Sequence, residues 1–165
     1  MKDGLKVDMP YAATLTGDNG NHIYGVNPLY CFTDITYFED IVFGDILLEI
    51  DCENVEILPD IYMGLGEHGF NSNKNETKFI YAEKNWDDVN TTPKSWKKRM
   101  MKKTKEFIDK YNITEFNIKE LLDKKSEQYR LAIELTGTAV IVKDVDPKYL
   151  KIIKDLTKNK KKDDN

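Results

Sequence analysis

Apolar residues along the 165-residue chain occur at several spacings, and each spacing predicts a different kind of element. Short apolar runs bounded by turn residues predict strands at 29–34, 45–51, 54–58 and 78–84. Residues 35–43, between the first two runs, have helical spacing and predict a short helix. Residues 1–28 and 59–77 are rich in Gly, Asn and Pro, which predicts two long loops.

The strongest helical pattern begins near residue 92. Thr92 is suited to the N-cap and Pro93 to the first helical position, and the helix is predicted to end near Tyr111. Its apolar stripe consists of Trp96, Met100, Phe107, Ile108 and Tyr111. A shorter helix is predicted at 117–124.

Apolar and polar residues alternate at 128–135, which predicts a strand. The turn residues of 136–138 then predict a hairpin with a second strand at 139–145, and Pro147 begins a predicted final helix. The expected fold is α+β, with a mixed, mainly antiparallel sheet, a long basic helix and a C-terminal hairpin plus helix.

Hydrophobic residues make up 40% of the chain, enough for one core, so we expect a single domain over 1–156 and a disordered tail at 157–165. No apolar run is long enough to span a membrane, and the N-terminus lacks the apolar centre of a signal peptide. These features predict a cytoplasmic protein with no membrane partner.

Cysteine and histidine are too few and too scattered to predict a metal site. The two cysteines, Cys31 and Cys52, lie in or beside apolar runs and are expected to be reduced thiols of the core. His22 and His68 are far apart and are expected to be loop residues rather than metal ligands.

Charge is distributed unevenly along the chain. Residues 1–90 contain five basic and 17 acidic side chains, whereas residues 91–165 contain 20 basic and 12 acidic ones. Residues 94–105 hold seven cations and no acid. Such a row can follow the phosphates of a nucleic acid. The predicted contacts are Lys97, Lys98, Arg99, Lys102 and Lys103. Alternatively, the row is a solvated helix face, or the two halves attract each other in the fold.

A second group of polar residues surrounds the predicted strand 128–135. By alternation, Gln128, Arg130 and Glu134 share one face, and Glu127 lies at the strand's edge. A carboxylate beside an arginine can orient a substrate or stabilise a developing cation. The alternative is a surface ion pair with little energetic effect.

Three segments of the sequence resemble ADP-ribosyltransferase-like domains, of the bacterial and phage type that modify nucleic acids or proteins, some of them as toxins. KDGLKV at 2–7 is similar to a segment near the start of these domains, and PLYCFTD at 28–34 is similar to their aromatic strand. SEQYRLAIEL at 126–135 is similar to the strand that carries their catalytic glutamate.

The resemblance implies NAD as the cofactor. Tyr30 or Phe32 would stack on the nicotinamide, with Gln128 and Arg130 also near the cofactor. Glu127 or Glu134 would stabilise the oxocarbenium character of the ribose as nicotinamide leaves. The family pattern favours Glu where this chain has Gln128, so the resemblance is compatible with an active transferase or an inactive relative.

Two other functions fit the sequence. One is a non-enzymatic phage or mobile-element protein that binds nucleic acid through helix 93–111, or a basic protein through its acidic half. The other is a subunit that only dimerises.

Overall fold

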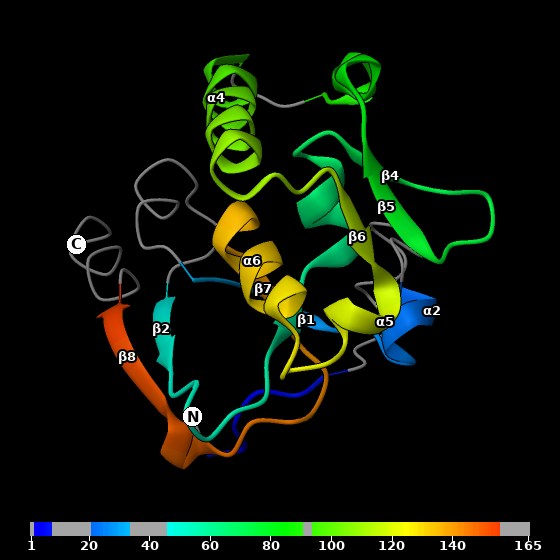
Figure 1. The fold of residues 1–165 in the computed structure, drawn as a ribbon. Helices are drawn as coiled ribbons and strands as arrows, with labels where there is room; N and C mark the ends of the chain where they lie inside the picture. The colour runs from blue at the N-terminus through cyan, green and yellow to red at the C-terminus, as the bar shows by residue number, and fades with distance from the viewer. Residues whose placement is uncertain (1, 8–20, 34–45, 91–93, 156–165) are drawn as a thin grey trace.

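The computed structural model describes residues 2–7, 21–33, 46–90 and 94–155 (Figure 1). Helices alternate irregularly with antiparallel sheets in this part of the chain, which confirms the α+β class. The predicted helix 35–43, the cap at Thr92 and the tail at 157–165 lie outside the described residues.

In the residues that the structure describes, the strands form three small antiparallel sheets. The first has β7 (Thr138–Ile141) between β1 (Leu29–Phe32) and β3 (Leu58–Pro59). The second pairs β2 (Ile46–Ile50) with β8 (Leu150–Asp155). The third has β5 (Lys78–Tyr81) between β4 (Phe70–Ser72) and β6 (Glu115–Asn117).

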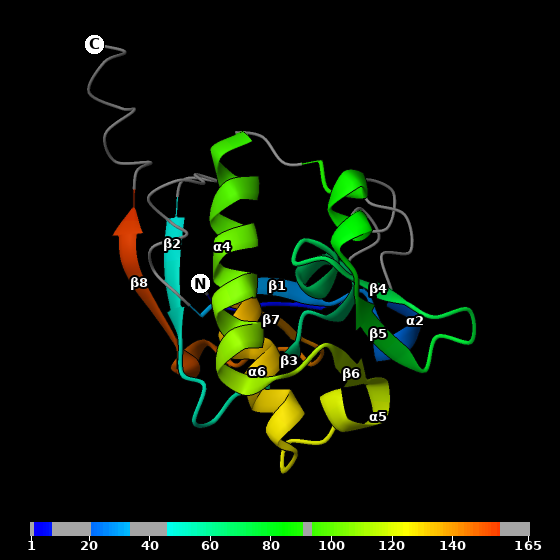
Figure 2. The same cartoon turned by 45° about the horizontal axis from the view of Figure 1, so that its top comes forward.

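The longest helix is α4 (Lys94–Tyr111), as predicted. A shorter helix, α6 (Glu127–Thr136), lies over β7 in both ribbon views (Figures 1 and 2). Between the helices and the third sheet lies the main apolar core. Its buried residues are Ile61, Leu65, Phe70, Phe79, Phe107, Phe116, Leu121, Leu131, Ala132 and Leu135. This core fixes α4 and α6 against the rest of the described chain.

Residues 128–135 form part of α6, so the predicted strand and its hairpin are wrong. Local helix signals outweigh the alternating pattern here. The Ser126 hydroxyl accepts a hydrogen bond from the backbone N–H of Gln128 at 3.2 Å, which caps the first turn. Gly137, at φ 65°, ends the helix in the left-handed region. Strand β7 does exist, but it pairs with β1 and β3.

The predicted final helix is also wrong. Pro147 begins only a single 3₁₀ turn, η3 (Pro147–Tyr149), whose N-cap Asp146 accepts a hydrogen bond from the Lys148 backbone at 3.0 Å. The chain then becomes strand β8, because its backbone pairs with β2. Tertiary pairing therefore overrides the helical spacing of this segment.

The predicted strands at 29–34, 45–51 and 78–84 correspond to β1, β2 and β5. The predicted strand 54–58 is mostly turn, with only Leu58 in β3, and the helix at 117–124 is reduced to α5 (Ile118–Leu121). Among the predicted loops, 1–28 contains the short helix α2 (Asn21–Tyr24), and 59–77 contains the π-helical turn η1 (Ile61–Leu65) and β4. A 3₁₀ helix, η2 (Glu83–Asp88), follows β5.

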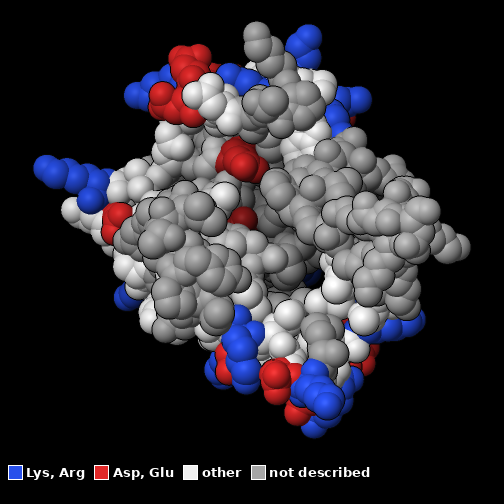
Figure 3. All heavy atoms as spheres, turned by 180° about the vertical axis from the view of Figure 1, so that it is seen from behind, with Lys and Arg blue, Asp and Glu red and all other residues white. Residues whose placement is uncertain are grey.

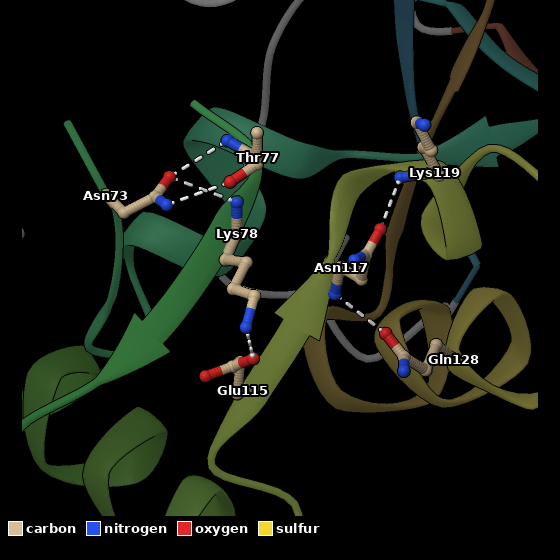
Figure 4. Close-up of polar contacts among 7 residues, drawn as sticks. All are labelled: Asn73, Thr77, Lys78, Glu115, Asn117, Lys119 and Gln128. Atoms are coloured by element: carbon tan, nitrogen blue, oxygen red, sulfur yellow. Dashed lines mark hydrogen bonds and ion pairs between the residues drawn. The ribbon is translucent and has the colours of Figure 1, made fainter. Parts of the chain in front are cut away.

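Side-chain hydrogen bonds fix the connections of the third sheet (Figure 4). The side-chain oxygen Oδ1 of Asn73 accepts hydrogen bonds from the backbone N–H groups of Thr77 at 2.8 Å and Lys78 at 3.1 Å. These two bonds close the β4–β5 turn. Lys78 also pairs with Glu115 across β5 and β6 at 2.7 Å. These contacts fix the β4–β5 turn and join β5 to β6.

Candidate functional site

The predicted nucleic-acid contacts all lie on α4, which brings them together on one helix. Lys98, Arg99 and Lys102 are exposed, whereas Lys97 and Lys103 are half-buried. Lys105, which was not among the predicted contacts, extends the exposed row. The opposite side of α4 is buried through Met100, Thr104 and Phe107. The helix therefore presents cations on the side that faces away from the core.

A buried polar contact attaches this helix to the chain after η1. The Nδ1 atom of His68 lies 2.9 Å from the hydroxyl oxygen of Thr104. Burial, and to a smaller extent the nearby charge of Lys103, lowers the pKa of His68 to about 3, so the imidazole is neutral at physiological pH. His68 was expected to be a loop residue and is instead part of the interior.

A cavity of about 360 Å³ lies between η1, β4 and η2. Its walls carry amides, two carboxylates and a small apolar surface. The lining residues are Tyr62, Met63, Gly66, Glu67, Asn71, Asn85, Asp88, Val89 and Asn90. Its volume lies at the lower end of the range for small-molecule sites. Val89 belongs to a buried apolar cluster with Trp86 and Met100, which links one wall of the cavity to α4.

Asn85 is the most deeply buried amide of this cavity, with 8% of its surface exposed. Its side-chain nitrogen donates to the carbonyl oxygens of Gly69 at 2.7 Å and Ile80 at 3.1 Å. Both amide hydrogens are thus used, which fixes the orientation of the group. Its side-chain oxygen accepts no hydrogen bond from the residues that the structure describes.

A second polar group lies beside the first sheet. Asp60 is buried, and the Thr138 hydroxyl donates to its Oδ2 atom at 3.2 Å. Burial raises the pKa of Asp60 to about 6. Burial and the charge of Asp60 also raise the pKa of Glu67. Figure 3 shows the face opposite to the one seen in Figure 1. Acidic side chains lie inside a hollow of this face, and Lys and Arg side chains lie at its outer edges.

The predicted aromatic contacts with NAD, Tyr30 and Phe32, lie on the same face of β1, with 43% and 47% of their surfaces exposed. Phe32 is directly opposite Thr138, so the hydroxyl that binds Asp60 belongs to this face. Burial and the nearby Asp60 charge raise the pKa of Tyr30. The charge of Asp60 therefore acts on Tyr30, an electrostatic relationship that the sequence did not predict.

The other predicted site residues lie in different surroundings. Arg130 forms ion pairs along the exposed side of α6, with Glu134 at 3.0 Å and Glu127 at 3.4 Å. Glu134 also accepts a hydrogen bond from the Tyr111 hydroxyl of α4 at 2.6 Å. Gln128 lies in the first turn of α6, where its side-chain oxygen accepts a hydrogen bond from the backbone N–H of Asn117 at 2.8 Å (Figure 4).

The two cysteines are free thiols. Cys31 lies in β1, where burial raises its pKa to about 12 and keeps the thiol protonated. Cys52 is exposed in a turn, so its expected place in the core is wrong.

Comparisons with known protein families, with curated proteins and with solved structures found no match to this chain. In the described part of the chain, no cluster of three or more His, Cys, Asp or Glu residues could hold a metal ion. None of the described helices has the length and apolar composition needed to cross a membrane.

Sequence reasoning missed the cavity residues because they lie in segments interpreted as loops. Asn85 and Asp60 follow strands by a few residues, but Asn and Asp are common turn residues and give no periodic signal. The π-helical geometry of η1 is frequent at functional sites, yet the sequence IYMGL predicts no such turn.

Proposed function

We propose that this protein binds nucleic acid through α4. The observation that carries the proposal is the row formed by Lys98, Lys102 and Lys105 on the exposed side of the helix. Spacings of four and three residues place these side chains above one another, over about 10 Å of helix. A row of this length can contact neighbouring phosphates of one strand, and each contact releases a counterion.

The charges around the lysine row of α4 favour an anionic partner. The acids nearest in sequence are Glu106 and Asp109, in the second half of the helix. Lys102 and Glu106 are 4.0 Å apart with side chains 80% and 68% exposed, so their ion pair contributes little. Because the whole chain carries a net charge of −4, phosphates are repelled elsewhere and attracted to α4, which orients the complex.

Binding of a fluorescently labelled single-stranded oligonucleotide, measured by anisotropy over a range of salt concentrations, tests the proposal. The triple variant Lys98→Gln, Lys102→Gln, Lys105→Gln should bind weakly and lower the salt slope by about two. The matched control replaces Lys74, Lys119 and Lys125 with Gln, three exposed lysines on other elements. Equal losses in both triple variants, or no binding by the natural protein, would refute the proposal.

A second candidate function is the binding of NAD beside Tyr30, which the resemblance to ADP-ribosyltransferases implies. The exposed ring of Tyr30, whose pKa the charge of the buried Asp60 helps to raise, favours a flat, positively charged ring such as nicotinamide. In this form of the proposal, Asp60 takes the place that the resemblance gave to Glu127 or Glu134. Transfer of ADP-ribose to a nucleic acid or a protein remains part of this candidate.

Calorimetric titration with NAD tests this second candidate. Tyr30→Ser should remove binding, and Arg130→Gln should leave it unchanged because Arg130 lies in the ion pairs of α6. The absence of heat at millimolar NAD, together with no labelling of DNA, RNA or protein, would reject it. An effect of Arg130→Gln equal to that of Tyr30→Ser would instead favour the residues expected from the sequence.

A further inference from the structure

We propose that the cavity between η1, β4 and η2 binds a small organic cation whose charged head donates N–H hydrogen bonds. Alkylguanidinium ions have this chemistry. The inference does not depend on the proposed function, because the exposed lysines of α4 do not line the cavity. It depends on three hydrogen-bond acceptors of the cavity wall, and on the charge that two of them carry.

Two carboxylates and one amide oxygen of the wall have no hydrogen-bond or ion-pair partner among the residues that the structure describes. The carboxylates belong to Glu67 and Asp88, which are exposed and therefore open to a ligand. The amide oxygen belongs to Asn85, of which 8% is exposed. The Asn85 nitrogen is bound to two backbone carbonyls, so the oxygen is the end of the amide left for the cavity. A buried acceptor without a donor carries an energetic penalty, which a ligand N–H group would relieve.

The charge of the wall favours a cation over an anion or a neutral ligand. Glu67 and Asp88 are each negative when ionised, and no Lys, Arg or His is among the described residues that line the cavity. The amides of Asn71 and Asn90 also line it. Each amide offers both donors and an acceptor, so these two residues accept ligands of either kind. The carboxylates therefore decide the sign of the charge on the ligand.

The surroundings of Glu67 favour a counter-ion at this place. Although the residue is exposed, the surrounding protein partly desolvates its carboxylate, which raises its pKa, and the negative charge of Asp60 raises the pKa further. Both effects oppose the ionised carboxylate, so a cation bound to it offsets them. Asp60 does not line the cavity, and its charge adds to the negative potential without contact with the ligand.

The remaining wall suits a short apolar chain attached to the charged head. Tyr62, Met63 and Val89 supply its apolar surface. The Tyr62 ring is held edge-to-face at 5.1 Å from the Phe79 ring and 5.6 Å from the His22 ring. An aromatic ring also attracts a cation that approaches its face. The volume of about 360 Å³ is sufficient for a chain of a few carbon atoms together with its head.

Three probes with the same number of non-hydrogen atoms separate charge from hydrogen bonding. They are n-butylguanidinium, the neutral n-butylurea, and n-butyltrimethylammonium, which is charged but has no N–H group. In NMR titrations at slightly alkaline pH, the natural protein should bind n-butylguanidinium about fivefold more tightly than either of the others. The side-chain amides of Asn71, Asn85 and Asn90 should shift, since all three line the cavity. Equal affinity for n-butylurea would overturn the role of charge, and equal affinity for n-butyltrimethylammonium would overturn the role of the N–H donors.

Four single variants test whether the cavity is the binding site. Glu67→Gln and Asp88→Asn should each weaken the binding of n-butylguanidinium about fivefold. Glu83→Gln and Asp87→Asn are the matched controls, because they remove the same charge at exposed positions that do not line the cavity, and they should change the affinity less than about twofold. Unchanged affinity in Glu67→Gln and Asp88→Asn would overturn the inference. An equal loss in the controls would also overturn it, since it would indicate diffuse attraction to an acidic surface.

The triple lysine variant of α4 separates this inference from the proposed function. It should lose oligonucleotide binding and keep its affinity for n-butylguanidinium, because the cavity wall is unchanged. Loss of n-butylguanidinium binding in this variant would overturn the inference. The absence of binding at millimolar n-butylguanidinium in the natural protein would also overturn it, and would leave the proposed function standing.

Discussion

The His68 imidazole and the Thr104 hydroxyl form a 2.9 Å hydrogen bond inside the protein, with 2% and 0% of their residues exposed. The bond joins the segment after η1 to the middle of α4. It is the polar counterpart of the buried apolar cluster of Trp86, Val89 and Met100. Together these contacts fix the lysine row of α4 relative to the cavity.

Thr104→Val should destabilise the protein by about 1–3 kcal/mol, because Val retains the volume but leaves the His68 Nδ1 atom without a partner. Thr104→Ser keeps the hydroxyl and loses a methyl group. We therefore expect Ser to be the less harmful substitution in urea unfolding experiments. A purely apolar role for this position would give the reverse order.

Gly64 and Gly66 should respond oppositely to alanine. A Cβ atom at Gly64 would lie 3.0 Å from the Thr138 hydroxyl oxygen and 3.1 Å from the Asp60 Cβ atom, so Gly64→Ala should destabilise by about 1–3 kcal/mol. Gly66 has ordinary helical dihedrals and open space around it, so Gly66→Ala should stabilise by about 0.4–1 kcal/mol. Thermal unfolding of both variants provides the measurement, and a stabilising Gly64→Ala would contradict the close packing of η1.

The sequence predicts α4 well because its signals agree. Met100 and Phe107 lie on one helical face, both are buried as expected, and the cations occupy the other positions. The class of fold and four of the strands, β1, β2, β5 and β7, also follow from local pattern. In these segments, the spacing of apolar residues reflects the side that is buried.

The prediction fails where a small residue hides the pattern. In α6, Leu131, Ala132 and Leu135 are the buried stripe, but Ala132 does not register as strongly apolar, and Ile133 completes an accidental alternation. Ser126 and Gly137, the two caps, were the better signal. Strand β8 and the cavity could not be predicted, because both depend on contacts between segments distant in the sequence.

Two neighbouring residues of α6 should differ in their effect on stability. Gln128→Ala removes the acceptor of the Asn117 backbone N–H and should destabilise by about 1 kcal/mol. Arg130→Ala removes only ion pairs of side chains that are largely exposed and should change stability by less than about 0.5 kcal/mol. Urea unfolding checks the order, and a larger effect at Arg130 would contradict the structural role given to this helix.

Protonation of His68 should oppose folding in acid. Because burial holds its pKa near 3, against 6.5 for an unperturbed imidazole, the unfolded chain binds one more proton between these values. Stability should therefore fall by up to about 1.4 kcal/mol for each pH unit below 6.5 from this group alone. His68→Asn should lack this loss, so its stability relative to the natural protein should rise as the pH falls. Parallel pH curves would contradict the neutral, buried imidazole.

Asp60 should act in the opposite direction. Its pKa is raised to about 6 by burial, against 3.8 for an unperturbed carboxyl, so the folded state binds the extra proton between these values. The cost of the buried charge is present at neutral pH and is relieved as the pH falls from about 6 to 4. Asp60→Asn lacks that relief, so it should lose stability relative to the natural protein over this range, measured by urea unfolding. Because His68 and Asp60 oppose each other here, the natural protein should show a flatter profile than either variant. A profile for the natural protein as steep as that of one of the two variants would mean that one of the two groups titrates normally.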